Sequence, residues 1–289
     1  MMLNKIIIGT ANLNTKYGLI KNNLNEKEFK KILIYAKKNK INTIDTSPNY
    51  TNSEKIIGKI NHGFNVITKI PKIPLNLKTN ELSAWIEKKI FDSLNNTNVK
   101  KFYGIHIQNA EVLLSNRSKT IYSTLSRLKK MKKYNKIGIS IYNFNTLMKV
   151  IKKFKIDFIQ VPFNVFDTRL LDKKLLNLLK KKKIEVHARS IFLQGLLVKN
   201  NYKIPAHLKD LKNNVKIWKN WVKEQNISQL NACLQFAFCT KEINKFVIGF
   251  NKFDEFKEII NFKKKNLNFK EIRFKTKKNV IDPRTWNKL

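Results

Sequence analysis

Short runs of apolar residues alternate along the chain with longer segments in which apolar residues recur every three or four positions. Short apolar runs are typical of strands, and the 3.6-residue spacing is typical of helices with one buried face. Eight such runs occur, at residues 5–8, 41–45, 64–69, 101–106, 136–140, 157–161, 184–188 and 245–249. Each is followed by helical spacing, and clear helical segments begin near residues 26, 53, 79, 143, 169 and 253.

Strands that alternate with helices imply a parallel sheet with both faces covered. Eight such units in 289 residues fit the α/β class and a closed (β/α)8 TIM barrel, which typically needs about 250 residues. The alternative is an open doubly wound sheet, which usually carries GxGxxG after a strand, and the chain has no such turn. Because no linker divides the chain, we expect one barrel domain over residues 1–289, with residues 264–289 as a C-terminal tail over the barrel.

The formal net charge of +39 raises the question of nucleic-acid binding, because Lys and Arg neutralise phosphates. Only six of the 59 basic residues are arginine, which is the preferred partner of phosphates and base edges. The lysines are spread over every helical segment instead of forming one patch. We therefore favour a compositional bias toward Lys, Asn, Ile and Phe over specific nucleic-acid binding.

The sequence also argues against a membrane, a signal peptide and a metal site. No apolar stretch approaches the roughly 20 residues of a membrane span. The first ten residues hold too short an apolar run for a signal peptide, so we expect a cytoplasmic protein. Cys233 and Cys239 are six positions apart in a helical stretch and would point to different faces, so we expect neither a disulfide nor a metal pair.

Polar residues stand at the ends of three successive predicted strands, where a (β/α)8 barrel builds its chemistry. These residues are Asp45, Lys69 and His106, and the loop IDTSPNY after the second strand adds Tyr50. Neighbouring strands lie about 4.8 Å apart, so the four side chains can converge on one point.

Each of these residues alone also has an ordinary structural explanation. Asp45 can cap a turn, and Lys69 is one of many lysines. His106 can be a hydrogen-bonded core residue, and Tyr50 can pack within its loop. We favour these explanations for any one residue, but an acid, an amine, an imidazole and a phenol at successive strand ends are harder to dismiss together.

The four groups also make chemical sense as a set. An ammonium beside a phenol favours its ionised form, so Lys69 would make Tyr50 a better proton donor at neutral pH. Asp45 would hold that lysine charged and in place, and His106 could donate a hydrogen bond to a substrate oxygen. A carbonyl held in this way is primed for hydride attack, and because no side chain supplies hydride, a nicotinamide cofactor is needed.

These residues lie in segments that resemble the aldo-keto reductase superfamily, namely IDTSPNY with SEKIIGK behind it, ITK, FYGIH, IGISIYN, IQVPFNV and RSIFLQGLL. The resemblance implies that the four residues are the catalytic tetrad, with Tyr50 as general acid. It implies that Ser140 and Gln160 hold the nicotinamide carboxamide, with Asn164 following in the same motif. The full set of cofactor-binding residues expected from the resemblance is Gly9, Thr10, Ser140, Gln160, Arg189, Ser190, Gly195, Gly249, Asn251, Lys252 and Glu255.

The chain departs from the family pattern at three of these positions. Ser140 is followed by Ile141, where the family often has Asn. Arg189 replaces the aromatic ring that stacks on the nicotinamide in many members. Glu255 falls where many members carry a basic residue for the 2′-phosphate of the cofactor, and a carboxylate would repel that phosphate. Because Asn251 and Lys252 lie close enough to compensate, we expect NADPH, narrowly ahead of NADH.

The opening GTANLNTKYG and the ending DPRTWNKL resemble bacterial members from polysaccharide and sugar-modifying loci, which suggests a sugar-like carbonyl substrate. Lys16, Tyr17 and Trp286 could line its site, although Trp286 could equally pack the tail over the barrel. We therefore expect an NAD(P)H-dependent carbonyl reductase. The alternative is a cofactor-binding regulatory or redox-sensing barrel, and the oligomeric state remains open.

Overall fold

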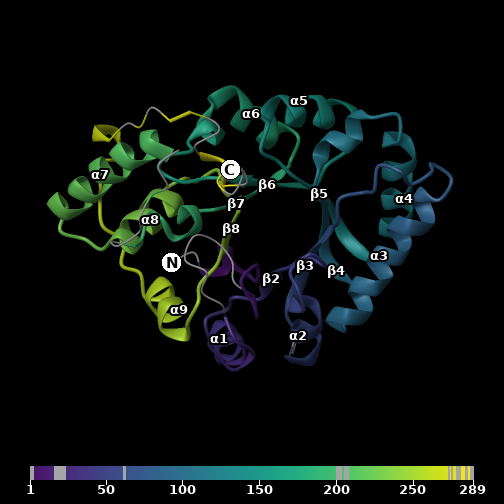
Figure 1. Cartoon of the computed structure of the whole chain (residues 1–289), viewed down its shortest axis with the longest axis horizontal. Helices are drawn as coiled ribbons and strands as arrows, with labels where there is room; N and C mark the ends of the chain where they lie inside the picture. Colours follow the sequence, from purple (N-terminus) through teal and green to yellow (C-terminus); the bar gives the residue numbers. More distant parts are fainter. Residues whose placement is uncertain are drawn as a thin grey trace.

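A computed structural model describes residues 3–15, 24–60, 63–199, 204, 208–272, 274, 276–277, 281–283 and 286. Within these residues, eight parallel strands close into a barrel in chain order, with helices around it (Figure 1). The strands are β1 (Ile6–Gly9), β2 (Thr43–Asp45), β3 (Asn65–Ile70), β4 (Phe102–Ile107), β5 (Tyr134–Ser140), β6 (Phe158–Pro162), β7 (Glu185–Arg189) and β8 (Lys245–Ile248). The predicted (β/α)8 barrel is confirmed.

The outer layer consists of amphipathic helices. They are α1 (Glu26–Lys38), α2 (Ser53–Ile60), α3 (Leu82–Thr97), α4 (Ser118–Lys130), α5 (Phe144–Lys153), α6 (Lys173–Lys181), α7 (Lys209–Glu224), α8 (Gln229–Phe238) and α9 (Phe253–Ile260). Short 3-10 turns stand at Leu3–Lys5, Ala110–Leu114, Arg169–Leu171, Leu193–Gly195 and Phe269–Glu271. No helix of the described residues is long and apolar enough to cross a membrane.

Polar caps decide where several helices begin. Asn25 accepts a hydrogen bond from the backbone N–H of Glu28 at 2.9 Å, so α1 begins at the predicted position. The helix predicted from Arg169 begins later, at Lys173. A 3-10 turn comes first, and the carboxylate of Asp172 then accepts from the backbone N–H of Leu175 at 2.8 Å.

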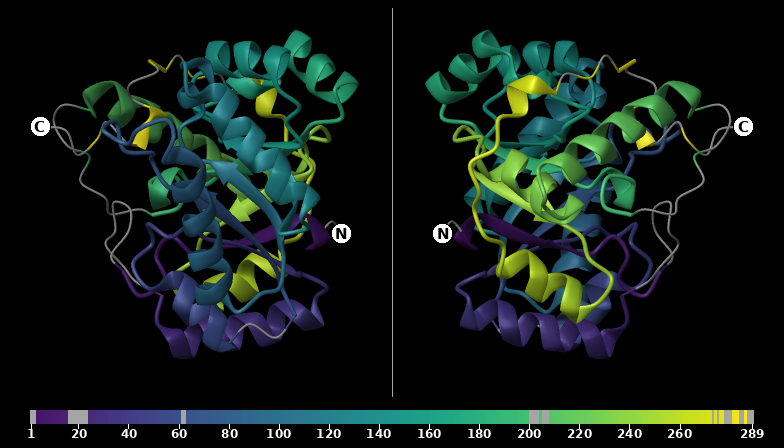
Figure 2. Two further views of the ribbon diagram at one scale, coloured as in Figure 1. Left: turned by 90° about the vertical axis from the view of Figure 1, so that its right-hand side faces the viewer. Right: turned by 90° about the vertical axis from the view of Figure 1, so that its left-hand side faces the viewer.

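The first and last strands close the barrel, which leaves no sheet edge among the described strands. Ile6 pairs with Phe246, and two residues further Ile8 pairs with Ile248. Outside this seam α1 and α9 lie side by side (Figure 2), where the ring of Tyr35 on α1 meets that of Phe253 edge-on at 5.5 Å.

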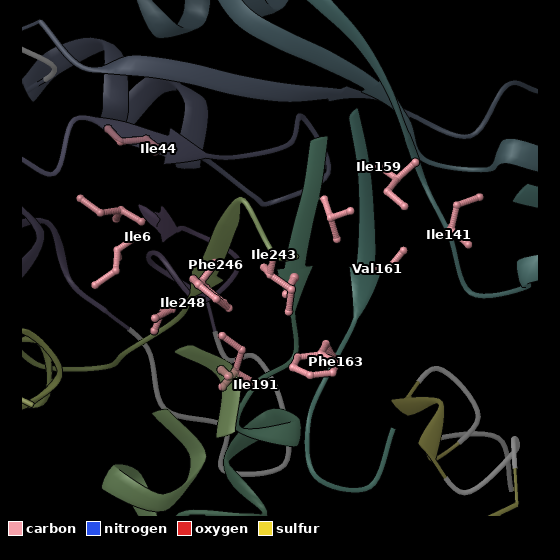
Figure 3. Close-up of a cluster of buried hydrophobic side chains, with 14 of the residues drawn as sticks. Ile6, Ile44, Ile141, Ile159, Val161, Phe163, Ile191, Ile243, Phe246 and Ile248 are labelled. Carbon is pink, nitrogen blue, oxygen red and sulfur yellow. The ribbon is translucent and has the colours of Figure 1, made fainter. Parts of the chain in front are cut away.

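Most of the core lies between the strands and the helices. Figure 3 shows part of this layer, with buried side chains from β1, β2, β6 and β8 and from residues next to β5, β6, β7 and β8. A smaller cluster of Ile7, Ile67 and Phe158 fills the inside of the barrel. The ring of Phe158 occupies the space that two glycines leave, because a Cβ on Gly104 or Gly138 would lie 2.7 or 2.4 Å from it. Phe158 thereby forms the floor beneath the strand C-termini.

The described part of the tail packs on the loop after β6 and on α7. Phe274 meets Phe166, in the loop after β6, with ring centroids 4.5 Å apart. Phe269 packs on Trp221 of α7 at 5.2 Å. Trp286 is buried at 4% exposure and belongs to the main core cluster. That residues 264–289 form a C-terminal tail over the barrel remains a prediction.

Candidate active site

A buried ion pair stands at the C-terminal ends of β2 and β3. The ammonium of Lys69 donates to Asp45 Oδ1 at 2.6 Å and to the carbonyl of Thr46 at 2.7 Å. Both side chains are about 95% shielded from solvent, with 5% of Lys69 and 4% of Asp45 exposed. Because a buried charge is tolerated only with a well-placed partner, each residue depends on the other.

The electrostatics of this pair keep both groups ionised. Burial alone would raise the pKa of Asp45, but Lys69 and His106 hold it well below its ordinary value. Burial alone would lower the pKa of Lys69, but the Asp45 carboxylate and Tyr50 raise it above its ordinary value. The site therefore holds a lysine that stays charged across the neutral range.

Tyr50 lies directly beside this lysine, in the loop between β2 and α2. The ammonium of Lys69 is 4.7 Å from the centroid of the Tyr50 ring. The backbone of Tyr50 is held by a turn, since its N–H donates to the Ser47 carbonyl at 3.0 Å. The neighbouring Asn49 donates to Gln108, two residues after His106, at 3.0 Å. Tyr50 itself is half-buried, so its ring borders the solvent.

His106 completes the group from the next strand. Lys69 and His106 are register partners on β3 and β4. The imidazole is fully buried, and its Nε2 is 3.6 Å from Asp45 Oδ2, which is too long for a direct hydrogen bond. No described residue hydrogen-bonds either ring nitrogen. Burial lowers the pKa of His106 to about 4, so the ring is neutral at neutral pH and can still donate one N–H.

The structure thus brings the four predicted side chains to one end of the barrel. A fifth side chain joins them from β6, namely Gln160, which the sequence analysis expects at the nicotinamide but not in contact with Asp45. The side-chain amide of Gln160 donates to Asp45 Oδ2 at 2.9 Å, although the two residues are 115 positions apart. Ser140 stands beside Gln160 as its register partner on β5.

Asn164 is used within its own loop. Its Oδ1 accepts from the backbone N–H groups of Phe166 and Asp167, at 2.9 and 3.1 Å, and its Nδ2 donates to the carbonyl of Ser190 at 3.1 Å. The side chain therefore ties the loop after β6 to the end of β7.

Arg189 ends β7 and stacks on an aromatic ring. Its guanidinium carbon lies 4.0 Å from the centroid of Tyr142, and its Nη1 makes a long contact of 3.4 Å with Ser190 Oγ. Its Nη2 is buried and has no partner among the described residues. Gly195 follows in the same loop with a φ of 89°, a conformation that favours glycine.

The loop after β8 is organised around Glu255. Its carboxylate accepts from the backbone N–H and the side-chain amide of Asn251, at 2.7 and 3.2 Å. Lys252 caps the N-terminus of α9 without a side-chain hydrogen bond. Directly after β1, Thr10 donates to the Asp45 carbonyl through its N–H and its hydroxyl, at 3.1 and 3.0 Å.

The remaining predicted residues are two glycines of the cofactor-binding set and two residues expected to line the substrate site. A Cβ added to Gly249 would meet nothing within 4 Å, whereas one on Gly9 would crowd the Ile248 carbonyl at 3.1 Å. Lys16 and Tyr17 lie outside the described residues. The described residues contain no group of three or more His, Cys, Asp or Glu side chains that could hold a metal ion.

This arrangement fits a nicotinamide dinucleotide. Ser140 and Gln160 offer neutral hydrogen-bonding groups at adjacent strand ends. The unpartnered Nη2 of Arg189 and the single N–H of the neutral His106 ring are donors in need of acceptors. Gly249 leaves open space beside the positive end of α9, which suits a phosphate.

The chain was compared with known proteins. Among solved structures it is similar to the aldo-keto reductase AKR11C1 of Bacillus halodurans in its holo form, with a TM-score of 0.72 and 16% identity, covering 96% of this chain and 90% of that one. It is also similar to the glycerol dehydrogenase AKR11B4 of Gluconobacter oxydans, with a TM-score of 0.68 and 18% identity, covering 92% of this chain and 88% of that one. At these identities the likeness shows the fold.

A search of curated proteins gave no significant match. The sequence profile described as the aldo/keto reductase family, in contrast, matches residues 5–279, which is nearly the whole chain. The chain therefore belongs to the aldo/keto reductase family and is an NAD(P)-dependent oxidoreductase of carbonyl substrates.

Proposed function

We propose that the protein reduces the carbonyl group of a small, sugar-like substrate with NADPH, and that Tyr50 is the general acid. The observation that carries the proposal is the buried ion pair of Asp45 and Lys69, whose ammonium lies 4.7 Å from the centroid of the Tyr50 ring. A buried ion pair contributes little net stability, and groups with strongly shifted pKa values cluster at functional sites, so this pair supports a chemical role.

Tyr50, Lys69 and Asp45 have different roles in the proposed reduction. A nicotinamide held by Ser140 and Gln160 would supply the hydride to the carbonyl carbon. Tyr50 then gives its hydroxyl proton to the carbonyl oxygen, which becomes an alcohol, and a tyrosinate remains. Lys69 stabilises that tyrosinate because its ammonium stays charged beside the ring. Asp45 keeps the ammonium in position.

His106 has a different part. Its imidazole is neutral at neutral pH, so it can donate an N–H to the carbonyl oxygen without competing as an acid. Neither ring nitrogen has a hydrogen-bond partner among the described residues, so one N–H is available for a substrate oxygen. A carbonyl between His106 and Tyr50 would be polarised before the hydride arrives.

The preference for NADPH depends on the loop after β8. The Glu255 carboxylate is already engaged by two donors of Asn251, which offsets part of its repulsion of a 2′-phosphate. Lys252, directly after Asn251, adds a positive charge to the same loop. Fluorescence titration with NADPH and NADH tests this assignment, and Glu255→Gln should tighten NADPH more than NADH. Tighter binding of NADH to the wild type would reverse the cofactor assignment.

The sugar-like substrate rests on sequence resemblance and on the glycerol dehydrogenase among the structural neighbours, a polyol enzyme. A panel of aldehydes, aldoses and ketoses that differ in chain length would test it. A preference for apolar aromatic aldehydes over every sugar would refute this part alone.

The role of Tyr50 is tested by Tyr50→Phe, which removes the proton but keeps the ring. We expect turnover to fall by about 100-fold or more, in line with the usual contribution of a general acid, while the Kd for NADPH changes little. Tyr122→Phe is a matched control, because that hydroxyl sits on the outer helix α4 and donates to the Lys155 carbonyl. A Tyr50→Phe variant with wild-type turnover would remove Tyr50 as the acid. Wild-type protein that binds NADPH but oxidises none of it across the panel would favour a regulatory barrel.

A further inference from the structure

One hydrogen bond connects opposite walls of the barrel. Gln160 stands on β6 and Asp45 on β2, and in a closed sheet of eight strands these two strands face each other. The Gln160 amide nevertheless reaches Asp45 Oδ2 at 2.9 Å. Both residues are buried, with 2% of Gln160 and 3% of Asp45 exposed. The contact therefore crosses the interior directly above the Phe158 floor.

We propose that Gln160 is a positioning residue for proton transfer, which fixes the Asp45 carboxylate and, through it, the Lys69 ammonium. The inference rests on the proposed function of Tyr50. It adds to the nicotinamide contact that the family resemblance implies for Gln160, because it gives the same side chain a second partner.

The need for this bond follows from the geometry of the carboxylate. Lys69 occupies Oδ1 at 2.6 Å, and His106 is too distant from Oδ2, at 3.6 Å, to serve it. Without Gln160, Oδ2 would be a buried anionic oxygen with no hydrogen-bond donor among the described residues. An Asp45 held at one oxygen alone could rotate about its Cβ–Cγ bond, and among the described residues the Thr46 carbonyl alone would then hold the Lys69 ammonium beside the Tyr50 ring.

The amide of Gln160 can serve both partners at once. Its nitrogen carries two N–H groups and its oxygen accepts. No described residue donates a hydrogen bond to Oε1. One N–H can therefore stay on Asp45 while the rest of the amide faces a carboxamide. Cofactor binding and the orientation of the proton-donating groups would then share one side chain.

The contact is tested first in the cofactor-free protein by a double-mutant cycle on thermal stability. The variants are Gln160→Leu, Asp45→Asn and the two combined. The Tm loss of the combined variant should be smaller than the sum of the two single losses by at least about 3 °C. The reason is that substitutions of residues in contact do not have additive effects on stability. Ser140→Ala is the control, since Ser140 neighbours Gln160 in register but has no hydrogen bond to Asp45. The Ser140→Ala and Asp45→Asn losses should add within about 1 °C, and the same additivity for Gln160→Leu and Asp45→Asn would overturn the proposal.

The positioning role is tested by separating binding from turnover. We expect Gln160→Leu to lower kcat about 10-fold or more at saturating NADPH, since small misplacements are costly in catalysis. Ser140→Ala should mainly weaken the Kd for NADPH measured by fluorescence. If Gln160→Leu also weakens only the Kd and leaves kcat unchanged, the amide serves the nicotinamide alone.

A rescue experiment distinguishes a missing hydrogen bond from general damage. In Gln160→Glu, the introduced carboxyl can donate to Asp45 only while it is protonated, because two facing carboxylates repel each other. Its kcat relative to wild type should be highest near pH 5 and fall with rising pH, whereas Gln160→Leu stays low throughout. Equal pH profiles for the two variants would contradict the proposal. These results are independent of the Tyr50→Phe test, so the two proposals can fail separately.

Discussion

The buried imidazole of His106 should make the protein lose stability in mild acid. Burial lowers the pKa of His106 from an ordinary 6.5 to about 4. A group with a depressed folded-state pKa contributes stability that is present above its unfolded pKa. That contribution is lost as the pH falls from 6.5 toward 4, because protonation then favours the unfolded chain.

The size of the effect follows from the two pKa values. The interval from 6.5 to about 4 is about 2.5 units, and at 1.36 kcal/mol per unit the loss approaches about 3 kcal/mol at pH 4. In His106→Gln the titrating ring is absent. The fall in unfolding free energy between pH 7 and pH 4 should therefore be about 3 kcal/mol smaller in this variant than in the wild type.

Urea unfolding at pH 7, 6, 5 and 4 measures this difference. Three titratable groups face His106, namely Asp45, Lys69 and His187. Lys69 stays charged throughout, and Asp45 titrates below this window because its pKa is depressed. His187 is also buried with a lowered pKa, so His187→Gln is measured alongside as the second contributor. Parallel stability curves for wild type and His106→Gln would refute the reasoning.

Three further changes test the packing and the charges. Gly138→Ala should cost about 1–3 kcal/mol, because its Cβ would lie 2.4 Å from the Phe158 ring, and adding Phe158→Leu should recover part of that loss in urea unfolding. Glu54→Gln should raise stability at neutral pH but not in acid. Burial raises the pKa of Glu54. The free-energy cost of burying its charge is therefore absent while the carboxyl is protonated, and it appears as the pH rises through that raised pKa. Lys69→Met should cost about 3–5 kcal/mol by leaving Asp45 buried and unpaired, and adding Asp45→Leu should restore much of it; an equally unstable double variant would count against this reading.

The fold could be predicted from the sequence because its signals are local. The spacing of apolar residues and the length of each apolar run distinguish strands from helices. Polar caps such as Asn25 mark where helices begin. The sequence predicts a helix from Arg169, which is too early, because the residue that caps this helix is Asp172. Strand-end position also brought Asp45, Lys69 and His106 together correctly, because neighbouring parallel strands end at the same rim.

Contacts across the barrel could not be predicted in the same way. The bond from Gln160 to Asp45 depends on how far two side chains reach inside a closed sheet, which no local pattern records. The bond from Asn49 to Gln108 joins two loops whose course the sequence does not fix. The sequence predicts that Asn251 and Lys252 lie close enough to compensate the charge of Glu255, but it does not indicate that Asn251 donates two hydrogen bonds to that carboxylate.

The seam between β1 and β8 has a consequence for biosynthesis. All four proposed catalytic residues have been synthesised once His106 is added to the chain, yet Ile6 must wait for Phe246 before the sheet can close. Until then β1 offers an unpaired edge, which is a template for aggregation. Production of this enzyme should therefore be sensitive to translation speed and to chaperones that shield nascent chains.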